Sequence, residues 1–369
     1  MKPNQKLFSV ILLLPAFVGL VLCPEESAQA VKEGLNLCAG VIIPALFPFL
    51  VLSSLTVSLG LALSLGRLLA PVTRRLFHIG AAGTGALTLG LIGGYPVGAR
   101  AVRQLWESGQ CSYEESVRLL TFCNNCGPSF LLGVAGGTVF HSVKTGCLLW
   151  AAHLLGTITV ALLTRGYRPA KAASMPDCAT QCPVQCVSFA RALTGAVQSG
   201  LQSTWNICAY VVLFRVILRF CNQVGAENLF RFLPNGAALF GGILELSTGV
   251  TALSPQTWGA VPLASFLLGF GGLAVWCQTM AMLDGSGLEL WPAFVGKLLH
   301  GGCAALWSVL LLRLFPQALP TAAFAGTVMP TVCLSWLPFA VAGGSWGIFG
   351  VSLAYFWRIS TGKSRQHRV

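Results

Sequence analysis

The chain has 369 residues, of which 55% are hydrophobic and only 9% are charged. Soluble domains carry about 25% charged residues, so the composition excludes an ordinary soluble fold and predicts an all-α polytopic membrane protein. The net charge of +12 comes from basic residues spread over short loops. This spread is typical of positive-inside topology and argues against nucleic-acid binding.

Residues 7–23 form the first apolar segment, and more membrane sequence follows them. We therefore interpret them as a retained transmembrane helix rather than a cleaved signal peptide. The acidic stretch 24–34 is expected in an external loop, and the basic stretches 67–75 and 358–368 are expected inside. Both termini are thus predicted to be cytoplasmic in a multi-pass cell-membrane protein. We expect about eight crossings plus re-entrant hairpins.

One extended polar stretch, residues 165–188, divides the chain into two halves, and each half contains a similar sequence segment. Residues 85–102 and 236–253 agree at six of eighteen positions and pair Gly94 with Glu245. Duplication with interrupted segments predicts a solute site at the repeat interface, with the repeats inverted or parallel. The expected parts are an N-terminal helix and external loop (1–34), a first membrane repeat (35–164), a cytoplasmic loop (165–188), a second repeat (189–315), and C-terminal helices with a basic tail (316–369).

The first interrupted segment is "VIIPALFPFLVLSS", in which Pro44 and Pro48 lie four residues apart. Both prolines fall on one helical face and remove two amide donors. A kinked packing helix and a functional gate both fit this pattern.

The second segment is "IGGYPVGA", residues 92–99. Gly94 and Gly98 relax the backbone, and Pro96 disfavours helical geometry at Tyr95. Irregular backbone inside a bilayer is tolerated only where protein or a wet cavity satisfies it. We therefore expect a re-entrant turn here, with an interfacial loop as the alternative.

The third segment is "FCNNCGPSFLLG", residues 122–133, which follows a short helix expected to be capped by Ser112. Asn124 and Asn125 can both donate and accept hydrogen bonds, and Gly127-Pro128 ends any preceding helix. Paired amides beside a break favour a polar ligand, although helix-packing hydrogen bonds fit equally well.

The fourth segment is "GGILELSTGV", residues 241–250, and Glu245 is the only formal charge between Gly236 and Met282. An ionisable group at membrane depth is a functional hypothesis by default. The alternative is a structural ion pair with Arg215 or Arg219. Further side chains expected to bind the solute with Glu245 are Ser247, Thr248 and Gln278.

Cysteine and histidine patterns predict neither a metal site nor an enzyme. The groups Cys123/Cys126 and Cys178/Cys182/Cys186 have no histidine close in sequence, so free thiols are expected, with a metal or redox site as the alternative in each place. The chain has no phosphate-binding loop of the GxxxxGKS kind. His78, His141, His153 and His300 are dispersed and are assigned packing or interface roles, and no cofactor is expected.

The stretches "IIPALFPFLVLSS", "GGYPVGARAVRQL", "EESVRLLTFCNNCGPSFLLGVAG" and "GGILELSTG" together resemble the YlbJ family of sporulation integral membrane proteins. The resemblance implies a gate or nucleoside-recognition domain, related in outline to nucleoside transporters and to the membrane part of FeoB. It also implies a role in endospore formation. Glu245 resembles the mid-helix acid of nucleoside transporters, but no Gln-Thr pair stands beside the first hairpin.

Two functions follow from these observations. One is a transporter of a small polar solute, nucleoside-like or other, through a mid-membrane site of broken helices. The alternative is a non-transporting scaffold for spore envelope assembly, with its partners bound to residues 165–188. The expected partners are the lipid bilayer and the solute, with a homo-oligomer or an assembly with sporulation membrane proteins left open.

Overall fold

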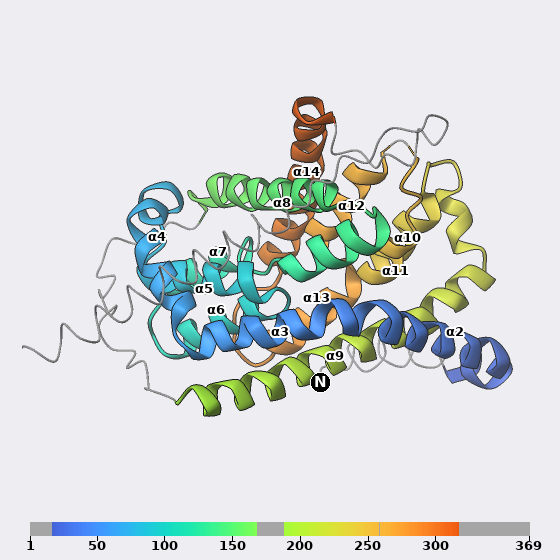
Figure 1. Ribbon diagram of the computed structural model, residues 1–369, viewed down its shortest axis with the longest axis horizontal. Helices are drawn as coiled ribbons and strands as arrows, with labels where there is room; N and C mark the ends of the chain where they lie inside the picture. The colour runs from blue at the N-terminus through green and yellow to red at the C-terminus, as the bar shows by residue number, and fades with distance from the viewer. Residues whose placement is uncertain (1–16, 168–187, 258, 317–369) are drawn as a thin grey trace, which may run out of the picture. The chain divides into compact units, whose positions relative to one another are not determined.

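A computed structural model describes residues 17–167, 188–257 and 259–316, and every regular element within them is a helix (Figure 1). These residues belong to a unit that spans Met1–Thr321. The predicted first apolar helix lies mostly outside the described residues. Cys178, Cys182, Cys186 and the basic C-terminal tail lie wholly outside them.

The first described span is continuous from Pro24 to Ser58. It consists of α2 (Pro24–Leu37), a π-helical turn (Cys38–Ile42) and α3 (Ile43–Ser58). The prediction of a loop over residues 24–34 is therefore wrong. Pro24 occupies the helix N-terminus and two glutamates follow in the first turn, positions that suit an N-terminal macrodipole.

The long helix α9 (Phe189–Gln223) packs against α2 and α3 in the antiparallel direction (Figure 1). The two helices approach closely because α9 carries a glycine where they meet: a Cβ on Gly200 would lie 2.8 Å from Val51 Cγ2. Small residues permit such close contacts between membrane helices. At the other end of the pair, Arg219 contacts Glu33 at 2.7 Å and Glu26 at 3.6 Å.

The next helices form a bent group that is tied together by polar contacts. Helices α4 (Leu61–Phe77) and α5 (Ala81–Gly93) meet at an angle of 104° between Ser64–Phe77 and Ala81–Gly93. After α6 (Val97–Glu107), the predicted cap of α7 (Tyr113–Leu120) is confirmed, because Ser112 Oγ accepts from Glu115 N at 3.1 Å. Glu115 Oε1 in turn accepts from Gly80 N at 2.8 Å.

Helix α14 packs against helices from both halves of the chain. The π-helical segment η2 (Ser129–Val139) leads to α8 (Val143–Thr164), which packs on α14 (Trp291–Leu314) together with α12 (Ala260–Phe270). Between α9 and α12 lie η4 (Ala226–Phe230), α10 (Gly236–Leu244) and α11 (Leu246–Thr251), and α13 (Gly272–Leu283) follows α12.

Five helical stretches in the described part of the chain are long and apolar enough to cross a membrane, or six if the bent α4–α5 pair is one span. Large apolar side chains point outward from them, including Trp205 (62% exposed) and Leu306 (68% exposed). An apolar exterior of this kind suits lipid. The predicted class, an all-α polytopic membrane protein, is confirmed, whereas the total of eight crossings also involves residues outside the described ranges.

Candidate functional site

Four interruptions of helical structure meet at one place. Each interruption separates two helices that follow one another along the chain. They are Gly94–Pro96 between α5 and α6, residues 121–128 between α7 and η2, Glu245 between α10 and α11, and Gly271 between α12 and α13.

Glycines allow these interruptions to touch. A Cβ on Gly94 would lie 2.9 Å from Gly127 N, and one on Gly271 would lie 3.1 Å from Tyr95 Oη. A Cβ on Gly272 would lie 2.8 Å from the Gly242 oxygen and 3.2 Å from Leu246 N. The backbone segments thus form a contiguous group, in which larger side chains would force the breaks apart.

Glu245 lies at the break between α10 and α11 and is only 4% exposed. Its two carboxylate oxygens accept from Ser247 N at 2.8 Å and from Thr248 N at 2.6 Å. Hydrogen bonds from backbone amides at a helix N-terminus favour a negative charge. Arg219 pairs with the glutamates of α2 instead, so the structural alternative of a Glu245–Arg219 ion pair is wrong.

A small inner cavity of ≈60 Å³ lies among three of the interruptions, at Gly94–Pro96, residues 121–128 and Glu245, and is also lined by α13. Gly94, Tyr95, Gly127, Glu245 and Ser247 line it, so the cavity has room for a few water molecules beside polar groups. Gln278 of α13 lines both this cavity and a larger neighbour. Three of the predicted solute-binding residues, Glu245, Ser247 and Gln278, are therefore brought together.

The larger neighbour is a vestibule of ≈510 Å³, a volume suitable for a small molecule. Leu50, Gly93, Ile207, Tyr210 and Gln278 line both spaces, which places the vestibule directly beside the inner cavity. Its polar lining comes from α3, α6 and α9: Ser53, Ser54, Arg100, Gln104, Ser199, Gln202, Ser203 and Asn206.

The polar face of α9 is a feature that the sequence reasoning missed. Ser199, Gln202, Ser203 and Asn206 line the vestibule. They follow the i, i+3, i+4, i+7 spacing of one helical face, which marks a stripe when the opposite face is apolar. This spacing in residues 199–206 was the signal that could have identified the vestibule.

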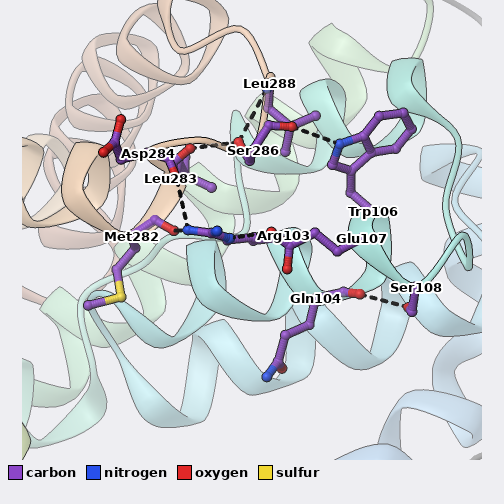
Figure 2. Close-up of polar contacts among 10 residues, drawn as sticks. All are labelled: Arg103, Gln104, Trp106, Glu107, Ser108, Met282, Leu283, Asp284, Ser286 and Leu288. Carbon is purple, nitrogen blue, oxygen red and sulfur yellow. Dashed lines mark hydrogen bonds and ion pairs between the residues drawn. The ribbon is translucent and has the colours of Figure 1, made fainter.

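Arg103 links α6 to the end of α13 (Figure 2), where Met282 lines the vestibule. From α6, its Nη1 donates to the main-chain oxygens of Met282 at 2.9 Å and Asp284 at 3.0 Å, at the C-terminal end of α13. Its Nε contacts Glu107 Oε1 at 2.6 Å, which orients the guanidinium. Trp106 adds a bond to the Ser286 oxygen at 3.0 Å. A cation is favourable at a helix C-terminus, so α6 holds the end of α13.

Several predicted residues lie elsewhere. Pro44 and Pro48 are exposed, and the helix continues through them, while Leu46 and Leu50 of the same helix line the cavities. Thr248 is buried, and its hydroxyl has no partner among the described residues. Pro96 lines the vestibule rather than the inner cavity, and Pro128 caps η2.

Gly98 lines neither cavity and instead allows α6 to pack closely against the segment after α7. A Cβ on it would lie 2.0 Å from the Cys123 oxygen, and one on Gly90 would lie 1.8 Å from that oxygen. The segment after α7 therefore passes tightly against both α5 and α6.

Asn124 and Asn125 line neither cavity. Asn124 Nδ2 donates to Thr279 Oγ1 at 2.8 Å, and Asn125 Nδ2 donates to the Phe122 oxygen at 2.8 Å. Asn125 Oδ1 accepts from Thr157 at 3.3 Å. These bonds agree with the packing alternative rather than with direct ligand contact, since they hold the segment in place.

A buried cluster of cationic and imidazole groups adjoins this segment. It contains Lys297 and His300 of α14 and His153 of α8, and the two imidazole centroids are 4.3 Å apart. The interpretation of these histidines as dispersed was wrong, because α8 and α14 bring them together. Lys297 was overlooked although it is the only Lys, Arg, Asp or Glu between Glu289 and Arg313.

The two aligned halves break at matching positions. Helix α5 ends before Gly94 and α10 ends before Glu245, the pair that the alignment places together. The similar stretches "SFLLGVAGG", from Ser129, and "SFLLGFGG", from Ser265, differ in structure, because Ser129 begins η2 whereas Ser265 lies inside α12. The duplication and its boundaries stay a prediction.

Among the described residues, no group of three or more His, Cys, Asp or Glu side chains is arranged to hold a metal ion. Cys123 and Cys126 are free and buried.

The spans, the polar interior and the broken helices define a class: a polytopic α-helical membrane protein with an internal polar site. The chain is 28% identical over 318 residues, 78% of each chain, to the sporulation integral membrane protein YlbJ of Bacillus subtilis (strain 168). The resemblance to the YlbJ family that was read from the motifs is thereby confirmed. No family model matches the chain. No solved structure matches it either.

Proposed function

We propose that this chain is a sporulation membrane protein that transports a small polar solute through the site where the four interruptions meet. The observation that carries the proposal is the pair of adjoining spaces: a ≈510 Å³ polar vestibule beside a ≈60 Å³ inner cavity lined by Glu245. The relative's name supplies the sporulation process. In this proposal the solute passes through chemically unchanged, without catalysis or a cofactor.

The lining suggests the class of solute. The vestibule offers hydroxyl and amide groups with one arginine, Arg100. The inner cavity offers the Glu245 carboxylate and the Ser247 hydroxyl, and Gln278 lies between the two spaces. Such groups recognise a solute rich in hydroxyl and amide groups. A nucleoside-sized molecule fits the vestibule, whereas only a small polar part of it fits the inner cavity.

The charge distribution suggests the orientation. The vestibule is lined by the C-terminal half of α3 and the N-terminal half of α9, next to Arg100. The acidic residues of α2 lie at the opposite end of this helix pair, against Arg219. By the positive-inside rule, we place the vestibule on the cytoplasmic side of the cell membrane, with both termini on the same side.

Uptake into proteoliposomes tests this proposal. Radiolabelled nucleosides, small carboxylic acids and divalent metal ions are each supplied to vesicles containing wild type, Glu245→Gln or the exposed control Glu25→Gln. We expect saturable uptake of one class by wild type and by the control, and none by Glu245→Gln at equal protein incorporation. Equal uptake by all three would remove Glu245 from the mechanism. No saturable uptake of any class would favour the scaffold.

A further inference from the structure

Lys297 is a buried ammonium group without an anionic partner among the described residues. It is 4% exposed, and none of the ion pairs found among the described residues includes it. Its Nζ donates to the Asn124 oxygen at 2.7 Å, lies 3.3 Å from His300 Nδ1, and lies 4.8 Å from the centroid of the Tyr95 ring. A buried charge without a counter-charge is costly, and an ionisable group inside a membrane span is a functional hypothesis by default.

The partners of His300 fix where its proton lies. His300 Nε2 is 3.0 Å from the His153 main-chain oxygen, which only accepts, and 3.2 Å from Thr157 Oγ1, which can donate or accept. Nε2 therefore carries the hydrogen in the neutral ring, and Nδ1 is left as an acceptor that faces Lys297 Nζ. A proton can then pass from the Lys297 ammonium to His300 Nδ1, leaving a neutral amine and an imidazolium.

His153 extends the cluster. Its Nε2 accepts from Cys126 N at 3.3 Å, so Nδ1 carries the hydrogen in the neutral ring. This Nδ1 is buried and has no partner among the described residues. An N–H group buried without an acceptor is costly, and it indicates a position where the hydrogen-bond pattern changes during function.

The surroundings of Lys297 contain few other titratable groups. Helix α12 contributes none, α8 contributes His153, and the broken segments contribute Tyr95 and Cys126. Helix α7 also packs on α14, but its Glu115 binds Gly80 N and its Arg118 binds the His78 oxygen.

The cluster of Lys297, His300 and His153 adjoins the wall of the inner cavity. Cys126 and Tyr95 both line the cavity. On their other side, the Cys126 amide binds His153 and the Tyr95 ring faces Lys297. A change of charge on Lys297 therefore acts directly on the Tyr95 ring, and it acts on the Cys126 amide through His300 and His153.

We propose that Lys297, with His300 and His153, is a proton-binding site that couples proton movement to the opening of the solute cavity. Lys297 holds the proton in one state of the cavity and passes it to His300 Nδ1 in the other. The coupling rests on the proposed transport function, whereas proton binding by the cluster is a property of the protein alone.

Proton binding is tested without any solute. Protein labelled with ¹³Cε-lysine is reconstituted in nanodiscs, and the lysine signals are followed by NMR against pH, with Lys297→Met used for assignment. If that variant does not fold, Lys297→Arg makes the assignment. We expect the Lys297 signal to titrate below about pH 9, where ordinary lysines remain protonated, and the exposed Lys144 to stay constant. A Lys297 signal that stays in the ammonium form throughout would overturn the proposal.

Coupling is tested with the solute class identified by the uptake experiment. We expect Lys297→Met and His300→Gln to lose accumulation driven by a pH gradient while they retain solute exchange between equal pools. Glu245→Gln is expected to lose both. Wild-type accumulation by a folded Lys297→Met or His300→Gln protein would overturn the coupling and leave transport intact. Absence of transport in the wild type would refute the proposed function and leave the NMR result to decide proton binding.

Discussion

The hydroxyl of Tyr95 donates a hydrogen bond to the main-chain oxygen of Leu268 at 3.0 Å. Tyr95 belongs to the interruption between α5 and α6, and Leu268 lies in the last turn of α12, just before the interruption at Gly271. One side chain therefore joins two breaks that are more than 170 residues apart in sequence. The inner cavity exists because such contacts hold the broken segments together.

Replacement of Tyr95 by Phe removes this bond and leaves a buried carbonyl without its donor. An unsatisfied buried polar group costs about 1–3 kcal/mol, so we expect a lower midpoint of thermal unfolding in detergent. Tyr210→Phe is the control, since Tyr210 lines the inner cavity as Tyr95 does, but its hydroxyl makes no hydrogen bond found in the described residues. Equal midpoints for the two variants would contradict the linking role of Tyr95.

Close packing between α6 and the segment after α7 predicts the effect of Gly98→Ala. The added methyl group would lie 2.0 Å from the Cys123 oxygen, a backbone atom that cannot rotate away. Overpacking of this kind costs about 1–3 kcal/mol or more. Gly302→Ala on α14 meets no atom within 4 Å and should be neutral or slightly stabilising. Thermal unfolding of both variants measures the difference, and a stable Gly98→Ala protein would show that the segments separate easily.

The hydrogen bonds from Arg103 to the end of α13 predict that Arg103→Met loosens the backbone there. Loss of the guanidinium leaves the Met282 and Asp284 oxygens without their donor (Figure 2). We expect faster amide hydrogen exchange in the last turn of α13 and the loop that follows, measured by mass spectrometry. Arg100→Met on the same helix is the control, and it should leave exchange in that region unchanged. Unchanged exchange in Arg103→Met would show that α13 is held by other contacts.

Glu115 predicts a pH dependence of stability at the α7 end of the molecule. Burial raises the pKa of this carboxyl above its ordinary value, while the Gly80 amide and the charge of Arg118 partly oppose the shift. Because the folded state then binds the proton more tightly, its contribution to stability is full below pH 4.5 and is lost as pH rises through the raised pKa.

We therefore expect the unfolding midpoint of wild type to fall more steeply than that of Glu115→Gln as pH is raised from 4.5. The variant keeps an acceptor for Gly80 N but does not titrate. Scanning calorimetry or dye-monitored unfolding over a pH series measures both slopes. Parallel curves would show that Glu115 titrates normally in the fold.

The sequence allowed the positions of the breaks to be predicted because glycine, proline and an isolated acid leave local signals. Gly94 and Glu245 both end helices as expected. Pro44 and Pro48 were poorer guides, since a helix tolerates prolines on a face that points outward. The loop expected over 24–34 was wrong because an N-terminal proline and two acidic residues suit a helix start.

The contents of the site were less predictable because they depend on which helices meet. Asn124 and Asn125 were good candidates by residue type, but their amides bond to neighbouring segments. Lys297 and His153 lie on helices far apart in sequence, and only the packing of α8 on α14 brings their groups near each other. The polar spacing on α9 was a local signal for the vestibule, and the isolated charge of Lys297 on α14 was a local signal for the buried cluster.

The central claim is that water and solute reach Glu245 through the vestibule. Single cysteines at Asn206, Ser247 and Leu201, introduced into a cysteine-free background, measure it through their rates of reaction with a water-soluble thiol reagent in membranes. Asn206 lines the vestibule, Ser247 lines the inner cavity, and Leu201 is 48% exposed on the outer face of α9. We predict rapid reaction at Asn206→Cys, slower but measurable reaction at Ser247→Cys, and almost none at Leu201→Cys. Reaction at Asn206→Cys and Ser247→Cys as slow as at Leu201→Cys would contradict an aqueous path to the four interruptions.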